Sequence, residues 1–273
     1  MSVYQQVEKN IFRTWLFIFL FSFIIILLGI FFAYFFNLPE IFYFALFLSF
    51  FQGFLSYWYC DKFILSFSKA KPLKKEEYPE VYNLVENLAI TAGLSTPKIY
   101  ILDDDSINAF ATGRNPKNSV ICLTRGAIEK LDKLELEGVI AHEFSHIKNN
   151  DILLLSVIAI LVSGIAYLSR LIFRFDFYSE DRKRENTGFV ILIGFLVAIF
   201  AYLFAYLLKL AISRKREFLA DASAVLLTRY PQGLINAFKK ISLDTKNTQV
   251  FIPLLPIYIY LILTEKEKKG NGF

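Results

Sequence analysis

The sequence predicts a mainly α-helical integral membrane protein. Four transmembrane helices accompany an α+β domain, and the second pair of these helices divides that domain into two parts. Two observations predict this class. Hydrophobic residues make up 55% of the 273-residue chain and gather in four apolar runs, each long enough to cross a bilayer as a helix. Between the second and third runs lies a stretch of about 90 residues with alternating helical and strand-like patterns.

The first two apolar runs predict an N-terminal transmembrane hairpin, residues 1–60. They extend over residues 15–36 and 41–60, and only the short link NLPE separates them. The first run is too long for the apolar core of a signal peptide, and no A-x-A cleavage pattern follows it. We therefore expect the hairpin to serve as a membrane anchor.

Residues 61–151 predict the first part of the α+β domain. Apolar residues at helical spacing predict a helix that ends at Gly93. The segments KIYIL, NAFATG and SVICLT predict three strands, with a turn at GRNPKN between the last two. A further helix opens at Asp132, because Glu135 three residues later completes a capping box.

The third and fourth apolar runs, residues 152–173 and 188–212, predict a second transmembrane hairpin over residues 152–212. Residues 213–248 then form the second part of the domain. Residues 249–273 are an atypical apolar segment with a charged tail.

The distribution of basic residues predicts the orientation in the membrane. Lys9 and Arg13 precede the first run, five lysines follow the second, and the NLPE link has none. We therefore expect a multi-pass protein of the cell (inner) membrane. The positive-inside rule places its N-terminus and the domain on the cytoplasmic side. The basic loop 174–187 would then face outside, against this rule, but the first helices usually decide the orientation of the whole chain. The +5 net charge thus fits a lipid bilayer, and without a recognition motif we expect no nucleic acid partner.

The segment VIAHEFSHIKNND, residues 139–151, contains both histidines of the chain. His142 and His146 are four residues apart and share one helix face, so one metal ion can contact both imidazoles. Glu143 projects beside the metal, where a carboxylate can act as the general base of a zinc hydrolase. Two surface histidines at this spacing by chance are the alternative, which is rare in a chain with only two.

A catalytic zinc ion needs a third protein ligand and one open position. No histidine remains, so the third ligand is a carboxylate or Cys122. The acidic residues of loop 174–187 fall on the far side of the membrane. Glu217 and Asp221 follow the fourth run, on the same side as the histidines, and are four residues apart. We assign Glu217 as the ligand and Asp221 as an acceptor for an imidazole N–H.

These motifs resemble the HtpX-like family of membrane zinc metallopeptidases, which are related to the CAAX prenyl endopeptidases. HEFSH is followed by EFLAD after a pair of apolar runs, and NAFATG and TRGAIEKL match the segments that precede the zinc helix. The resemblance implies a zincin-like domain and a zinc endopeptidase of the gluzincin type, acting on polypeptides in quality control of membrane proteins.

The resemblance also implies roles for individual residues. The zinc ligands would be His142, His146 and Glu217, with one Zn²⁺ per chain, and Glu143 would be the general base. Asn108, Ala109, Phe110 and Ala111 would form an edge strand that binds an extended substrate.

The resemblance extends from about Tyr4 to Lys240, and past the third-ligand helix family members usually continue into a soluble segment with an STHPP-like motif. Here the chain continues with VFIPLLPIYIYLIL, so we expect substrate positioning and oxyanion stabilisation to differ, although the metal site is complete. Two alternatives remain. A prenyl-protein (CAAX) endopeptidase carries the same motifs, but four runs do not easily enclose its chamber. A catalytically inactive membrane scaffold that retains zinc is the alternative of another class.

Overall fold

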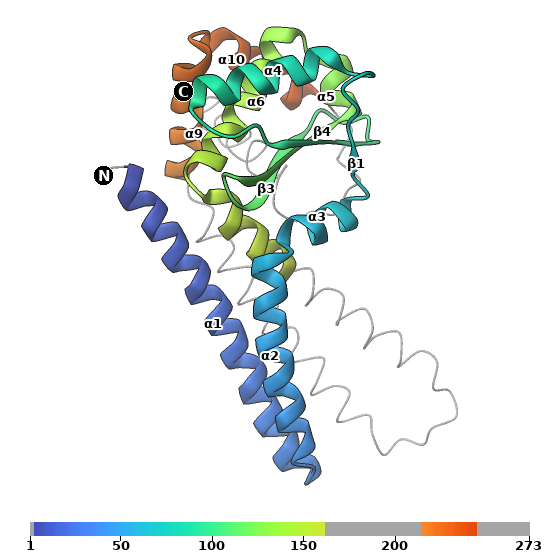
Figure 1. Ribbon diagram of the computed structural model, residues 1–273, viewed down its shortest axis with the longest axis vertical. Helices are drawn as coiled ribbons and strands as arrows, with labels where there is room; N and C mark the ends of the chain where they lie inside the picture. The colour runs from blue at the N-terminus through green and yellow to red at the C-terminus, as the bar shows by residue number, and fades with distance from the viewer. Residues whose placement is uncertain (1–2, 162–213, 245–273) are drawn as a thin grey trace, which may run out of the picture.

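The structure is a computed structural model that describes residues 3–161 and 214–244. Within these ranges it is mainly helical, with one four-stranded sheet (Figure 1). The helices are α1 (Val3–Phe36), α2 (Glu40–Trp58), α3 (Cys60–Ser68), α4 (Pro79–Ala92), α5 (Arg125–Lys130), α6 (Lys133–Lys148), α9 (Arg214–Thr228) and α10 (Pro231–Leu243). The strands are β1 (Lys71–Pro72), β2 (Lys98–Leu102), β3 (Ala109–Asn115) and β4 (Asn118–Thr124).

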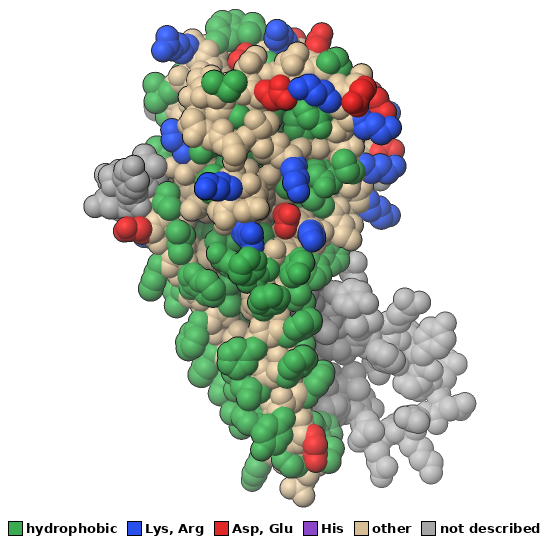
Figure 2. All heavy atoms as spheres, in the orientation of Figure 1, with side chains coloured by type: hydrophobic (Ala, Val, Ile, Leu, Met, Phe, Trp, Pro, Cys, Tyr) green, Lys and Arg blue, Asp and Glu red, His purple; other side chains and the backbone are tan. Residues whose placement is uncertain are grey.

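Helices α1 and α2 form the N-terminal hairpin and extend away from the part of the described chain that contains the sheet (Figure 1). Both are long and apolar enough to cross a membrane, over Val7–Phe36 and Glu40–Trp58. Hydrophobic side chains cover their surface, whereas charged side chains gather on the domain (Figure 2). Helix α1 begins at Val3 rather than near residue 15, so its polar first turns belong to the helix as well.

The sheet has the strand order β1-β2-β4-β3. Strands β2 and β4 are parallel, whereas β3 is antiparallel to β4 and β1 is antiparallel to β2. The three strands expected from the sequence are confirmed, and so is the helix that ends at Gly93, which adopts a left-handed conformation with φ of 70°. Strand β3 is an edge strand, because among the described residues it pairs only with β4.

Helices cover both faces of the sheet. Ile121 and Leu123 of β4 point into the main core, which they share with residues of α4 and α6. Cys122 points to the opposite face, where it packs against Ile64 of α3. Cys122 therefore lies away from the helix that carries the histidines, and the alternative that it is the third metal ligand is wrong.

The third apolar run begins with a helix, Asp151–Leu161, whose axis makes an angle of 87° with that of α6. Its side chains are mostly buried, and Leu153 and Val157 pack against Ile18 of α1. The rest of this run, the fourth run and loop 174–187 lie outside the described residues. Among the described residues two helices are long and apolar enough to cross a membrane, or three if the bent pair counts as one span.

Candidate metal centre

Helix α6 holds the two histidines in place, because its first turn is capped and the side chains of its later turns are buried. The Asp132 side chain accepts hydrogen bonds from the backbone N–H groups of Leu134 and Glu135, each at 2.9 Å, and Glu135 accepts one from the Asp132 N–H at 2.8 Å. The expected capping box is thus confirmed. His142 and His146, in the later turns, are only 5% and 7% exposed, and their Nε2 atoms lie 3.2 Å apart.

Helix α9 packs along α6 and brings Glu217 to the two imidazoles. Glu217 Oε2 lies 3.6 Å from His142 Nε2 and 3.9 Å from His146 Nε2. A point about 2.1 Å from all three atoms exists within this triangle, which matches the usual Zn–N distance of about 2.0–2.1 Å. The two imidazoles and one carboxylate are therefore close enough together to hold a single zinc ion.

Each imidazole also donates its other N–H to a carboxylate. His142 Nδ1 donates to Asp221 Oδ1 at 2.9 Å, and His146 Nδ1 donates to Asp151 Oδ2 at 3.2 Å. Such outer contacts fix the tautomer that leaves Nε2 free to bind a metal. The sequence pattern singled out Asp221 but not Asp151, because the bend after α6 that turns Asp151 back towards His146 has no clear signature in the sequence.

The electrostatics of the cluster favour a positive charge at this place. Burial alone would lower the pKa of His142, but the hydrogen bonds to Asp221 and Glu217 outweigh it and raise that pKa to about 10. For Glu217, burial would raise the pKa, but the hydrogen bond with His142 and the charges of the two histidines lower it. Three carboxylates around two imidazoles thus form an environment in which a bound cation is stabilised.

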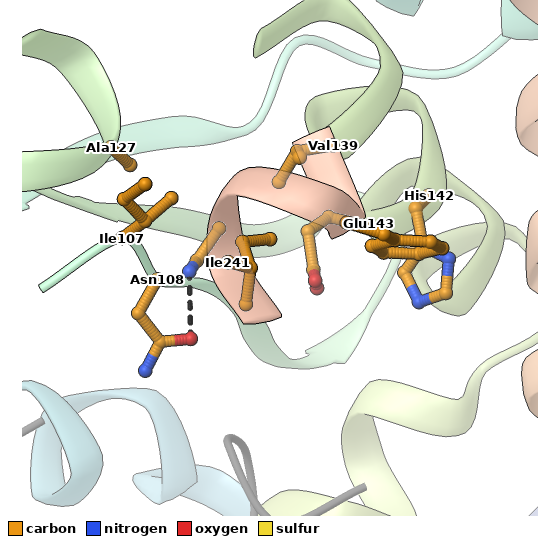
Figure 3. A pocket seen from close by; sticks show the side chains of 9 residues that line it. Ile107, Asn108, Ala127, Val139, His142, Glu143 and Ile241 are labelled. Carbon is orange, nitrogen blue, oxygen red and sulfur yellow. Dashed lines mark hydrogen bonds between the residues drawn. The ribbon is translucent and has the colours of Figure 1, made fainter. Parts of the chain in front are cut away.

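Glu143 lies next to the cluster, at an apolar cavity. The cavity is lined by His142 and Glu143 together with the apolar side chains of Ile107, Ala109, Ala127, Val139, Phe238 and Ile241. Figure 3 shows the Glu143 carboxylate directed to the same side of α6 as the His142 imidazole. The walls contributed by Phe238 and Ile241 of α10 were not expected from the sequence, because no metal or strand motif marks them.

Helix α10 reaches this cavity because two glycines allow close contact with α6. A Cβ atom on Gly138 would lie 2.8 Å from the backbone N of Leu234, and one on Gly233 would lie 2.4 Å from the carbonyl oxygen of Leu134. Such distances are too short for any side chain. The close approach also brings the Phe238 ring against His142, with ring centroids 6.1 Å apart in an edge-to-face arrangement.

Strand β3 borders the same cavity through Ala109, preceded by Ile107 and Asn108. The Asn108 carbonyl oxygen accepts a hydrogen bond from the backbone N–H of Thr124 at 3.0 Å, so this group faces β4. Backbone groups alternate in direction along a strand, so those of Ala109 and Ala111 face the other edge of β3, which pairs with no strand among the described residues. The Asn108 side chain accepts a hydrogen bond from the Ala109 N–H at 2.9 Å (Figure 3).

Comparison with known proteins gives consistent matches. Residues 75–262 match peptidase family M48. A protease HtpX homolog from Dictyoglomus thermophilum is 44% identical over 242 residues, covering 88% of this chain and 80% of that protein. One from Thermoanaerobacter pseudethanolicus is 38% identical over 257 residues, covering 91% and 86%.

Among solved structures, the crystal structure of S. mikatae Ste24p aligns with a TM-score of 0.44 and 20% sequence identity, covering 95% of this chain and 66% of that one.

The family match extends over more than half of the chain, and the relatives above are aligned over most of their length. The chain therefore belongs to peptidase family M48 and is a membrane metalloendopeptidase.

Proposed function

We propose that this metalloendopeptidase uses one zinc ion, held by His142, His146 and Glu217, to hydrolyse polypeptides at the cytoplasmic surface of the cell inner membrane. One observation carries the proposal: two imidazole nitrogens and a carboxylate oxygen converge in a buried cluster beside Glu143. Zinc bound there would supply Lewis-acid polarisation of the scissile carbonyl group.

The protein groups around the metal supply the rest of the chemistry. The Glu143 carboxylate accepts the proton of the attacking water and passes it to the leaving amine. Asp221 and Asp151 hold the two imidazoles in the orientation that directs Nε2 to the metal. Because Glu143 is only 6% exposed, bulk water is largely kept away from this proton transfer.

The substrate would bind as an additional strand along β3. The outward-facing backbone groups of Ala111 can pair with an extended polypeptide, and so can the carbonyl group of Ala109, whose N–H donates to the Asn108 side chain. Asn108 and Phe110 flank these groups. Phe110 itself is buried on the opposite face of the sheet, so it supports the strand rather than contacting the substrate. The apolar cavity beside Glu143 would then take one apolar side chain next to the scissile bond.

The membrane hairpin supports a role with membrane proteins. Helices α1 and α2 would anchor the catalytic domain at the bilayer surface, where it meets segments that leave the membrane. Backbone pairing reads no particular sequence, so a misfolded membrane protein with an extended segment suits this site. Quality control of membrane proteins is the biological role we assign.

Reconstitution of the full chain in lipid vesicles tests the proposal. An unfolded membrane protein should be cleaved, a chelator should stop the cleavage, and added zinc should restore it. Cleavage restricted to prenylated peptides would replace the proposal with the prenyl-protein endopeptidase alternative. Zinc-loaded protein that cleaves neither substrate would favour the inactive scaffold.

A further inference from the structure

The first turns of α1 reach the metal centre through a buried asparagine. Asn10 is 4% exposed, although it lies on a helix whose later turns are apolar. Its Nδ2 donates hydrogen bonds to Asp151 Oδ1 at 2.7 Å and to the backbone carbonyl of Asn149 at 2.9 Å. Because Asp151 Oδ2 in turn accepts from His146, two successive hydrogen bonds connect the N-terminal membrane helix with an imidazole of the cluster.

Both acceptors of Asn10 lie at the bend that follows His146. Helix α6 ends at Lys148, and the next helix begins at Asp151 at an angle of 87°. Asn150 between them has a φ of 54°, in the left-handed region. The last carbonyl groups of a helix have no partner within it, and Asn10 supplies one for Asn149. A single side chain of α1 thus binds the chain on both sides of the bend.

Asp151 also contacts the helix that carries Glu217. Arg216 NH1 donates to Asp151 Oδ1 at 3.2 Å, and Arg216 directly precedes Glu217. Asp151 is 4% exposed, and a buried carboxylate is costly unless its oxygens have donors. With Asn10 and Arg216 both on Oδ1, the other oxygen is left directed at His146. Asp151 therefore joins α1, α6 and α9 at the metal centre.

We propose that Asn10 is a positioning residue for the metal centre: through Asp151 it fixes the orientation of His146, so that zinc affinity depends on the docking of α1 against the domain. The inference rests on the proposed function, because it requires that His146 binds zinc. It makes the first turns of the membrane anchor a functional part of the site.

The test measures the zinc dissociation constant of the full chain in detergent micelles, by competition with a chromophoric chelator. Asp151→Ala should raise this constant about 10-fold to 100-fold, as expected for outer contacts of metal ligands, and Asn10→Ala by a smaller factor of about 3 to 10. Thr14→Val is the matched control. Thr14 is buried one turn further along α1, and its hydroxyl donates to the carbonyl of Asn10 in the same helix.

A double-mutant cycle separates positioning from helix packing. If Asn10 acts through Asp151, adding Asn10→Ala to Asp151→Ala should weaken zinc binding by no more than about twofold. Should Asp151→Ala fail to fold, Asp151→Asn takes its place in the cycle. Additive effects, an unchanged constant for Asn10→Ala, or an equal loss in Thr14→Val would each overturn the inference.

Glu217→Ala in the same assay keeps the two proposals apart. Zinc affinity that does not respond to Glu217→Ala contradicts the assigned ligand set, and with it the proposed function. Affinity that falls in Glu217→Ala but not in Asn10→Ala contradicts only the role of Asn10.

Discussion

The side chains at the metal centre have ligand chemistry in common but come from distant parts of the chain. His142 and His146 lie one turn apart on α6, whereas Glu217 is about 70 residues further along and reaches them only because α9 packs on α6. Two imidazoles and a carboxylate suit zinc and leave a fourth position open for catalysis. The role of each residue can therefore be tested one substitution at a time.

Glu217→Ala should lower zinc affinity strongly, because two imidazoles alone do not complete the ligand set. Equilibrium dialysis against buffered zinc measures the loss. Glu80→Ala, which removes an exposed carboxylate from α4, is the control and should bind zinc as the unchanged protein does. Equal losses in the two variants would reject Glu217 as a ligand.

Zinc affinity should rise with pH through the neutral range. A proton and a metal ion compete for the same imidazole nitrogen. Asp221 and Glu217 raise the pKa of His142 to about 10, so His142 holds a proton at neutral pH before zinc binds. Zinc binding should therefore release protons, which calorimetry in buffers of different ionisation enthalpy measures. Binding at neutral pH without proton release would contradict this.

At the scale of helices and strands, local patterns predicted what depends on local chemistry. Residues close together in the sequence predicted the capping box at Asp132, the left-handed conformation of Gly93 and the strands. The structure confirms all of these features. Strand β1 was missed because a two-residue segment that contains Pro72 gains its strand character only by pairing with β2. Helix α3 was missed because it continues the apolar run after a break at Tyr59.

The features missed at the metal centre depend on tertiary contacts. Asp151 contacts His146 only because the chain turns by 87° after α6, and Asn10 matters only because α1 docks at that turn. Phe238 reaches the cavity because Gly138 lets α10 approach α6. Asp151 lies only five residues after His146, but no helical or strand periodicity predicts a contact across a sharp bend. The partners of the other contacts lie far apart in the sequence, so periodicity and motifs could not predict them either.

Helix α10 should influence which substrates are cleaved. Phe238→Ala would widen the apolar cavity beside Glu143, so cleavage should shift towards substrates with larger apolar side chains next to the scissile bond. A change of about 10-fold in the ratio of kcat/KM values between a large and a small side chain is expected, given the usual discrimination of about 1–3 kcal/mol per methylene group.

A set of peptides that differ only at that position measures the ratio. Phe218→Ala is the control, because Phe218 is a phenylalanine of α9 that is 60% exposed. An unchanged ratio in Phe238→Ala, or the same change in both variants, would show that α10 does not shape the substrate site.

For the whole molecule, the orientation in the membrane decides which substrates can reach the site. We expect the β3–β4 turn to face the cytoplasm and the link between α1 and α2 to face outside. Single cysteines at Lys117 and Leu38 test this with an impermeant reagent on intact cells, after Cys60 and Cys122 are replaced. Labelling of residue 117 from outside would overturn the orientation.

Glu143→Gln tests the central claim most directly, because it separates metal binding from catalysis in one protein. The amide keeps the size of the side chain but cannot accept the proton of the attacking water. The variant should hold one zinc ion per chain, as the unchanged protein does, and lose proteolysis by about 10²-fold to 10⁴-fold. Glu137→Gln on the same helix is the control and should keep both properties. Full proteolysis by zinc-loaded Glu143→Gln would contradict the account.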